Sequence, residues 1–161
     1  MLYTNSMNII IWDPIYTHLL LAMFLGMSLG VERFIAHKTA GMRTYTLISM
    51  GSALFVIISQ IVTSASSTSI YDPMRVAAQI ISAVGFLGVG AIFHKGNQLS
   101  GVTTASGLWV AAGIGMACGF GLYKLAIVIT ILVLSIFIFM WFVEKAIRKL
   151  PIKTKEEEFP L

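Results

Sequence analysis

The chain has 161 residues, of which 57% are hydrophobic and 11% charged, against roughly 45–50% and about 25% in an ordinary globular domain. A mean hydropathy of +0.87 with fourteen glycines indicates helices that face lipid and pack through small residues, and it argues against a water-soluble domain. The net charge of +4 sits mostly in short hydrophilic gaps and at the C-terminal end, without a continuous basic face, so no nucleic-acid partner is expected.

Five apolar segments are each long enough to cross a bilayer core about 30 Å thick, which takes about 20 helical residues. They are predicted at 15–32, 45–63, 74–93, 104–123 and 125–143. Together they predict an all-α, polytopic helical bundle in which residues 1–143 form one domain in the lipid bilayer. Residues 144–161 are expected to form a short charged tail at the cytoplasmic membrane surface.

The basic residues are divided unequally between the two sides of these spans. By the positive-inside rule, the side with more Lys and Arg faces the cytoplasm, so the C-terminus is expected inside and the N-terminus outside. Tyr45 and Trp141 are expected as interfacial aromatic residues on the basic side. That side carries nine basic residues, Arg33, Lys38, Arg43, Lys95, Lys145, Arg148, Lys149, Lys153 and Lys155, and the other side carries Arg75 and Lys124.

Small residues recur every four positions in the first and fourth spans, a pattern that allows close approach of helix backbones. The fifth span has no glycine and is rich in β-branched and aromatic residues. The first four spans are therefore expected in the packed core and the fifth at the edge facing lipid. The recurring small residues are Ala22, Gly26 and Gly30, then Gly107, Ala111, Gly115 and Gly119.

A shift of sixty residues aligns two pairs of glycines and two pairs of hydroxyl residues between the first and second halves of the chain. The alignment suggests a weak parallel repeat of two helical hairpins, although coincidence in a glycine-rich chain explains it equally well. The aligned pairs are Gly30 with Gly90, Gly41 with Gly101, Thr44 with Thr104, and Thr46 with Ser106.

A polar membrane cluster is predicted where the third span begins. Asp72 is expected as the N-cap with Pro73 in the first helical turn. Arg75 and Gln79 follow on one helix face, which is expected to turn inward or toward a water-filled vestibule, because such groups are costly against lipid. Two interpretations stay open: a functional polar site, or an Arg75 that extends to the interface and pairs with Asp72.

A second polar cluster is predicted on the cytoplasmic side, where the first span ends and the second and fourth begin. Glu32 is expected to pair there with Arg43 or with threonine hydroxyls of the third gap. A solvated charge pair at the interface is the alternative interpretation. The residues of this cluster are Glu32, Arg33, Arg43, Thr44, Thr103 and Thr104.

Nothing in the sequence indicates an enzyme, since it has no phosphate-binding glycine loop, HExxH motif or nucleophile elbow. Neither a metal site nor a cofactor is expected, because His18, His37 and His94 lack further ligands at metal-binding spacing. Cys118 is the single cysteine. It is expected either as a small packed residue or as a functional thiol.

Three segments in a consistent order resemble the membrane domain of the MgtC/SapB family. They are GVER with AGMRTYTLISMGSALF, then DPMRVAAQIISAVGFLGVGAIF, then GVTTASGLWVAAGIGMACGFGLY, between about residues 20 and 125. The resemblance implies a five-span protein of the bacterial inner membrane, linked to growth under magnesium limitation and to virulence through survival in host phagocytes. The resemblance also implies functional roles for the residues that match the family motifs, namely Glu32, Arg33, Arg43, Thr44, Asp72, Arg75, Gln79, Thr103, Thr104 and Cys118.

Longer members of that family carry a C-terminal cytoplasmic domain, whereas residues 144–161 are all that follow the last predicted span here. Two functions are compatible with the sequence. One is a non-enzymatic regulator that binds a partner membrane protein, or another copy of itself, and adjusts membrane energetics or ion homeostasis. The other is an ion transporter or channel whose polar path runs near Arg75, Gln79 and the serines of the second span.

Overall fold

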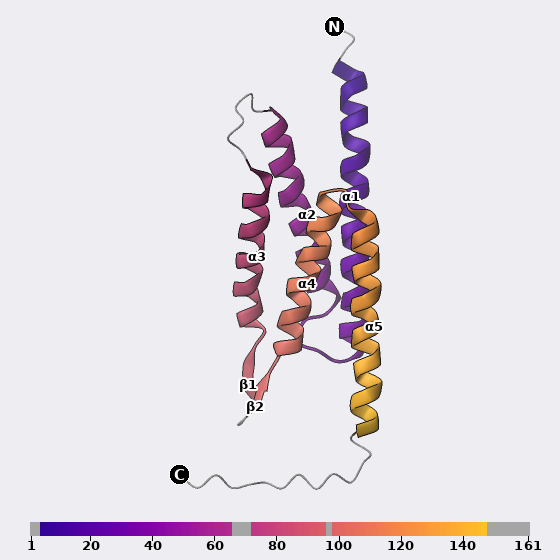
Figure 1. The fold of residues 1–161 in the computed structure, drawn as a ribbon, viewed down its shortest axis with the longest axis vertical. Coiled ribbons are helices and arrows are strands. Elements are labelled where there is room, and N and C mark those ends of the chain that lie inside the picture. The colour runs from indigo at the N-terminus through magenta and orange to yellow at the C-terminus, as the bar shows by residue number, and fades with distance from the viewer. Residues whose placement is uncertain (1–3, 66–71, 96–97, 148–161) are drawn as a thin grey trace.

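The structure, a computed structural model, describes residues 4–65, 72–95 and 98–147 and consists mainly of five helices (Figure 1). The prediction of an all-α helical bundle is confirmed. The charged tail lies outside the described residues from residue 148 onward. In chain order the elements are α1 (Thr4–Ile35), α2 (Met42–Ala65), α3 (Pro73–Gly90), β1 (Phe93–Lys95), β2 (Gln98–Ser100), α4 (Val102–Gly119) and α5 (Tyr123–Ile147).

Four of these helices are long and apolar enough to cross a membrane, which makes the chain a multi-pass membrane protein. They are α1 over Ile15–Ile35, α2 over Met42–Ser64, all of α4 and all of α5. The apolar part of α3, Met74–Gly90, is shorter. At 1.5 Å per residue its 17 residues rise about 26 Å, slightly less than the hydrocarbon core.

The third helix ends three residues before the end of the predicted span. Backbone N–H groups at Ala91 and Ile92 close its last turn onto the carbonyls of Gly88 and Val89. An antiparallel hairpin follows, in which Phe93 pairs with Ser100 and His94 with Leu99. The sequence predicts no strands in this gap, because three residues per strand are too few to show an alternating pattern.

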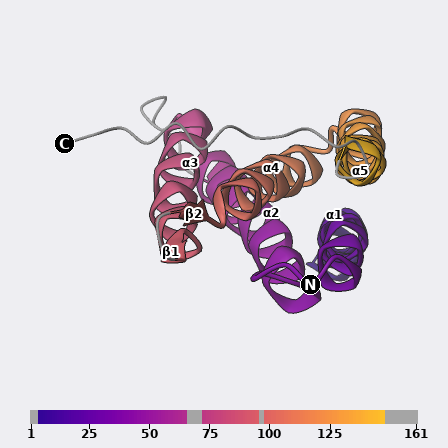
Figure 2. The same ribbon diagram turned by 90° about the horizontal axis from the view of Figure 1, so that it is seen from below.

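The five helices run alternately up and down, so α1 begins and α5 ends at opposite ends of the bundle (Figure 1). Viewed from below, α2 and α4 lie in the middle, with α3 on one side and α1 and α5 on the other (Figure 2). The contacts agree, because α4 touches all four other helices. Helix α5 contacts α1 and α4 and buries Ala126 and Thr130, as expected for a helix at the edge.

The small-residue ridges of α1 and α4 both pack against α2, at almost the same place. A Cβ atom on Gly26 would lie 2.6 Å from the Cβ atom of Ser49, and one on Gly115 would overlap the carbonyl of Ser49. One turn further, a Cβ atom on Gly119 would lie 2.8 Å from the carbonyl oxygen of Ala53. The backbones of α1, α2 and α4 therefore approach so closely that glycine is the residue that fits.

The two hairpins α1–α2 and α3–α4 share their direction, but the aligned residues do not share their environment. Thr104 is buried whereas Thr44 is exposed. A Cβ atom on Gly30 would collide with the backbone of Met42, whereas one on Gly90 would meet open space. The suggested parallel repeat therefore describes the topology of the two hairpins and does not extend to their packing.

Candidate functional site

A polar cavity of about 220 Å³ lies between α1, α4 and α5, at the end of the bundle where α1 and α5 end and α4 begins. Two acidic, two basic and one hydroxyl side chain line it together with an apolar wall from α5. The polar residues are Glu32, Arg33, Lys38, Thr103 and Glu144, and the wall includes Ile136, Phe137, Met140 and Trp141. We call this cavity the basic-end cavity.

Arg33 is the most deeply buried charged group of this cavity, with 3% of its surface exposed. Its Nη2 donates to Oε1 of Glu32 at 2.8 Å, and its Nε donates to Oε2 of the same carboxylate. The guanidinium carbon lies 3.6 Å from the ring centroid of Phe137. A buried charge is tolerated when it is paired and hydrogen-bonded, and the carboxylate fork and the aromatic face meet that condition.

One nitrogen of this guanidinium remains without a partner. Nη1 of Arg33 is buried and hydrogen-bonds to no atom in the described part of the chain. An unsatisfied buried N–H donor costs free energy, so native structures usually supply an acceptor. The Nη1 nitrogen of Arg33 therefore keeps its N–H donors unpaired among the described residues.

Tyr45 and Gly107 form the support behind the Arg33 side chain. The Tyr45 side chain is fully buried, and its hydroxyl donates to the carbonyl of Thr104 at 3.3 Å. A Cβ atom on Gly107 would overlap the Tyr45 hydroxyl and lie 3.2 Å from Cζ of Phe137. The small surface of Gly107 admits the Tyr45 ring into the bundle, and the interfacial depth expected for Tyr45 stays a prediction.

The turn that ends α1 brings Lys38 to the cavity. The backbone N–H of Lys38 donates to the carbonyl of Arg33 at 3.0 Å, and His37 between them has a φ of 52°. This is the 6→1 hydrogen bond of a Schellman-type C-cap with the left-handed residue at His37. Lys38 and Glu144 both line the cavity, and within the described residues neither forms an ion pair.

Half of the predicted cytoplasmic cluster meets at this cavity. Glu32, Arg33 and Thr103 line it, and Thr104 lies directly behind. The expected pairing of Glu32 with Arg43 is wrong, because Glu32 pairs with its neighbour Arg33. Arg43 and Thr44 are exposed in the first turn of α2 and do not line the basic-end cavity.

The residues of the predicted polar membrane cluster do not converge. Asp72 is the N-cap of α3, as predicted, and its side chain accepts from the backbone N–H of Met74 at 2.9 Å. Arg75, Gln79 and Asp72 are all exposed, and within the described part of the chain Arg75 forms no ion pair with Asp72. The expectation that this face of α3 turns toward the inside of the bundle is wrong for the single chain.

Cys118 and His18 lie away from the basic-end cavity. Cys118 is fully buried in the core, between two glycines that pack on α2, so its placement agrees with the small packed residue. The ring of His18 packs edge-on against Tyr123 with centroids 5.2 Å apart. In the part of the chain that the structure describes, no three His, Cys, Asp or Glu residues are grouped to hold a metal ion.

Seven of the ten residues that line the basic-end cavity are absent from the predicted clusters, among them Lys38, Phe137, Trp141 and Glu144. A signal for three of them exists in the sequence, since Phe137, Trp141 and Glu144 follow at spacings of four and three and so share one face of a helix. The expectation of a lipid-facing fifth span assigns this helix face no contact with the rest of the bundle. Which face of α5 meets Arg33 depends on how the helix is rotated in the bundle.

A bundle of apolar, membrane-length helices with a buried ion pair at one end defines a multi-pass helical membrane protein. Within that class, the chain belongs to the MgtC family, which it matches over residues 19–146. It is 40% identical to Protein MgtC of Salmonella typhimurium over 145 residues, which cover 90% of this chain and 60% of that protein. It is 42% identical to Protein MgtC of Brucella abortus over 129 residues, which cover 78% of this chain and 52% of that protein.

The chain therefore spans between half and two thirds of the length of these relatives. The matched region contains all the residues of the basic-end cavity, from Glu32 to Glu144. No solved structure matches the chain.

Proposed function

We propose that this protein is a non-enzymatic regulator in the bacterial inner membrane. In this proposal it binds a partner membrane protein and thereby adjusts ion homeostasis or membrane energetics, which supports growth at low magnesium and virulence. The observation that carries the proposal is the basic-end cavity: a buried Arg33 held by Glu32 and Phe137, with its Nη1 nitrogen unpartnered among the described residues. A guanidinium that is held in place on two sides and still has unpaired N–H donors is suited to hydrogen-bonding a group on a partner protein.

The orientation belongs to the same proposal. The ends of α1 and α5 and the starts of α2 and α4 lie together at one end of the bundle, and Arg33, Lys38, Arg43 and Lys145 lie in these segments. This excess of basic residues supports a cytoplasmic position for that end and for the C-terminus, with the N-terminus outside.

The packing of the predicted polar path favours a regulator over a transporter. Ser49 and Ser52 in α2 are buried, and the Ser49 hydroxyl is already used, since it donates to the carbonyl of Ala22 at 2.8 Å. Arg75 and Gln79 lie on the exposed face of α3. Ser52 lines a cavity between α2 and α3 that neither Arg75 nor Gln79 lines, so within the described part of the single chain these groups do not line a common path.

The alternative is an ion path formed between copies of the chain, and the outward position of Arg75 and Gln79 is the observation that favours it. Flux into proteoliposomes separates the two functions. Purified protein is reconstituted around a trapped magnesium-sensitive dye, with an ionophore added at the end to verify that the dye responds. For a regulator we expect the same influx as in protein-free liposomes. A protein-dependent influx that Arg75→Gln abolishes would contradict the proposal in favour of the alternative.

A further inference from the structure

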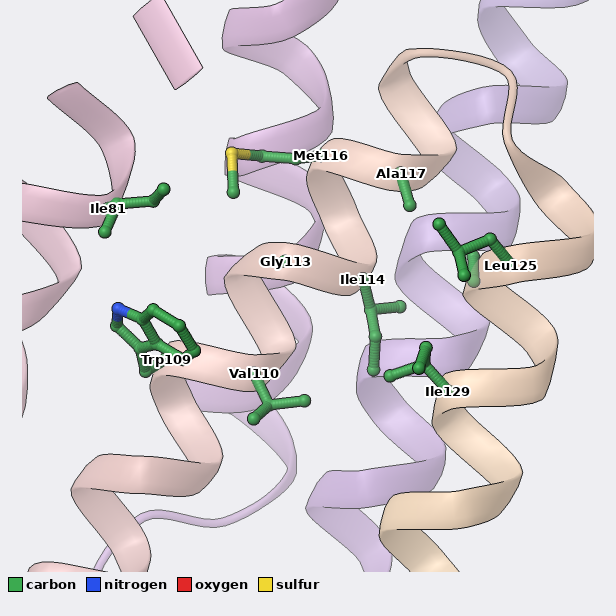
Figure 3. A pocket seen from close by; sticks show the side chains of 10 residues that line it. Ile81, Trp109, Val110, Gly113, Ile114, Met116, Ala117, Leu125 and Ile129 are labelled. Atoms are coloured by element: carbon green, nitrogen blue, oxygen red, sulfur yellow. The ribbon is translucent and has the colours of Figure 1, made fainter. Parts of the chain in front are cut away.

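The basic-end cavity is the first of three cavities that follow one another along the groove between α4 and α5. A cavity of about 330 Å³ shares Thr103, Ile136 and Phe137 with it and continues along both helices to Val110. A third, of about 400 Å³, shares Val110 and continues past Gly113. Figure 3 shows this last part, with Val110, Ile114 and Ala117 of α4 facing Leu125 and Ile129 of α5.

The three cavities change in character along this path. The basic-end cavity has five polar or charged residues in its lining, the second has only the hydroxyl residues Thr103 and Ser106, and the third is lined by apolar side chains and glycine. A polar head followed by an apolar groove fits an amphiphile. The ten helical steps from Thr103 to Gly113 rise about 15 Å, which equals half of a bilayer core about 30 Å thick. The groove therefore has the length of one acyl chain in one leaflet.

The charges at the head of the groove select the headgroup. Arg33 is neutralised by Glu32, but its buried Nη1 still lacks an acceptor among the described residues. Lys38 and Glu144 line the same cavity with opposite charges and, within the described chain, without ion-pair partners. The lining thus has two positive and two negative groups, and a ligand that satisfies them carries an anion and a cation together.

From this arrangement we infer that the α4–α5 groove binds a membrane phospholipid with a zwitterionic headgroup, a phosphate joined to a primary ammonium, as in phosphatidylethanolamine. The phosphate accepts from Lys38 and from the Thr103 hydroxyl, which line the basic-end cavity beside the Arg33 guanidinium. The ammonium lies at the carboxylate of Glu144, and one acyl chain follows the groove to Gly113. The inference does not depend on whether the protein regulates a partner or conducts ions.

Native mass spectrometry of the detergent-purified chain tests the inference. The protein is titrated with phosphatidylethanolamine, with the anionic phosphatidylglycerol of the same acyl chains, and with glycerophosphoethanolamine, which has the headgroup alone. We expect phosphatidylethanolamine to bind about tenfold more tightly than phosphatidylglycerol, the factor that one charge-assisted hydrogen bond supplies. We expect no binding of glycerophosphoethanolamine at the same concentration. Equal binding of the two phospholipids, or full binding of the headgroup alone, would overturn the inference.

Two variants test the two ends of the site separately. Glu144→Gln removes the partner of the ammonium at an exposed position, so it should abolish the preference for phosphatidylethanolamine while leaving phosphatidylglycerol binding unchanged. Gly113→Leu fills the groove, and the space around a Cβ atom at Gly113 is open, so it should weaken binding of both phospholipids.

Gly85→Leu is the matched control for the groove, since Gly85 also faces open space but lies on α3, outside the three cavities. It should leave lipid binding unchanged. If Gly113→Leu retained full lipid binding and instead dissociated a dimer of the chain, the groove would be an interface between copies and the inference would be wrong.

Discussion

Replacing Gly115 by alanine is expected to destabilise the protein by about 3 kcal/mol, at the upper end of the cost of overpacking a core. The added methyl group would overlap the backbone carbonyl of Ser49 on α2, and a backbone group cannot rotate out of the way as a side chain does. Helices α2 and α4 would have to separate. Thermal unfolding in detergent measures the effect, which should lower Tm by roughly 6–12 °C for a chain of this size.

Gly113→Ala is the control, on the same helix and half a turn away. Its Cβ atom would meet open space, and alanine is a better helix former than glycine by about 1 kcal/mol. We therefore expect Tm to stay the same or to rise slightly. If both variants lost stability equally, a general intolerance of α4 to substitution would explain the loss, and the close packing of α4 on Ser49 would be refuted.

The second large effect is expected from Glu32→Gln. The substitution keeps the size of the side chain but removes the negative charge that neutralises Arg33, which is 3% exposed. Breaking a buried ion pair by removing one partner costs about 3–5 kcal/mol, because the remaining charge stays buried without compensation. Arg33 would have to leave the face of Phe137 to reach water. The loss of Tm in detergent should match or exceed that of Gly115→Ala.

Two further variants separate this effect from a general change of charge. Glu144→Gln removes a carboxylate from the same cavity, but this carboxylate is exposed and unpaired in the described chain, so its Tm should not change. The double substitution Glu32→Gln with Arg33→Met removes both charges and should recover most of the lost stability. If the double variant were as unstable as Glu32→Gln alone, the loss would come from packing around residue 32 and not from the uncompensated Arg33.

Much of the fold follows from the sequence because lipid imposes simple rules. Runs of about 20 apolar residues identify α1, α2, α4 and α5, and the glycine ridges correctly indicate which helices pack closely. The end of α3 and the short β-hairpin could not be read in the same way. They depend on pairing between Phe93 and Ser100, a tertiary contact that leaves no periodic pattern in three-residue strands.

The candidate site was predicted only in part, because proximity between helices depends on their rotation. Glu32 and Arg33 stood out as charges at the end of a span, and pairing of Glu32 with Arg43 was a reasonable inference from opposite charge. Glu32 and Arg33 are neighbours on α1, and their side chains form two parallel hydrogen bonds. Spacing along a helix does not predict this pairing, because adjacent residues lie on different faces. The position of Phe137 under the guanidinium requires the crossing of α1 and α5, which the sequence does not specify.

Growth at limiting magnesium tests the central claim most directly, namely that the Arg33 site is the functional centre of the protein. A bacterial strain that lacks its own MgtC is complemented with Arg33→Lys or with Arg43→Lys, at equal amounts of protein in the membrane. An ammonium cannot reproduce the planar fork to Glu32 and the spare N–H donor of Arg33, whereas Arg43 is exposed and outside the cavity. We predict that Arg43→Lys restores growth and Arg33→Lys does not. Full growth with Arg33→Lys, or equal loss with both variants, would contradict the claim.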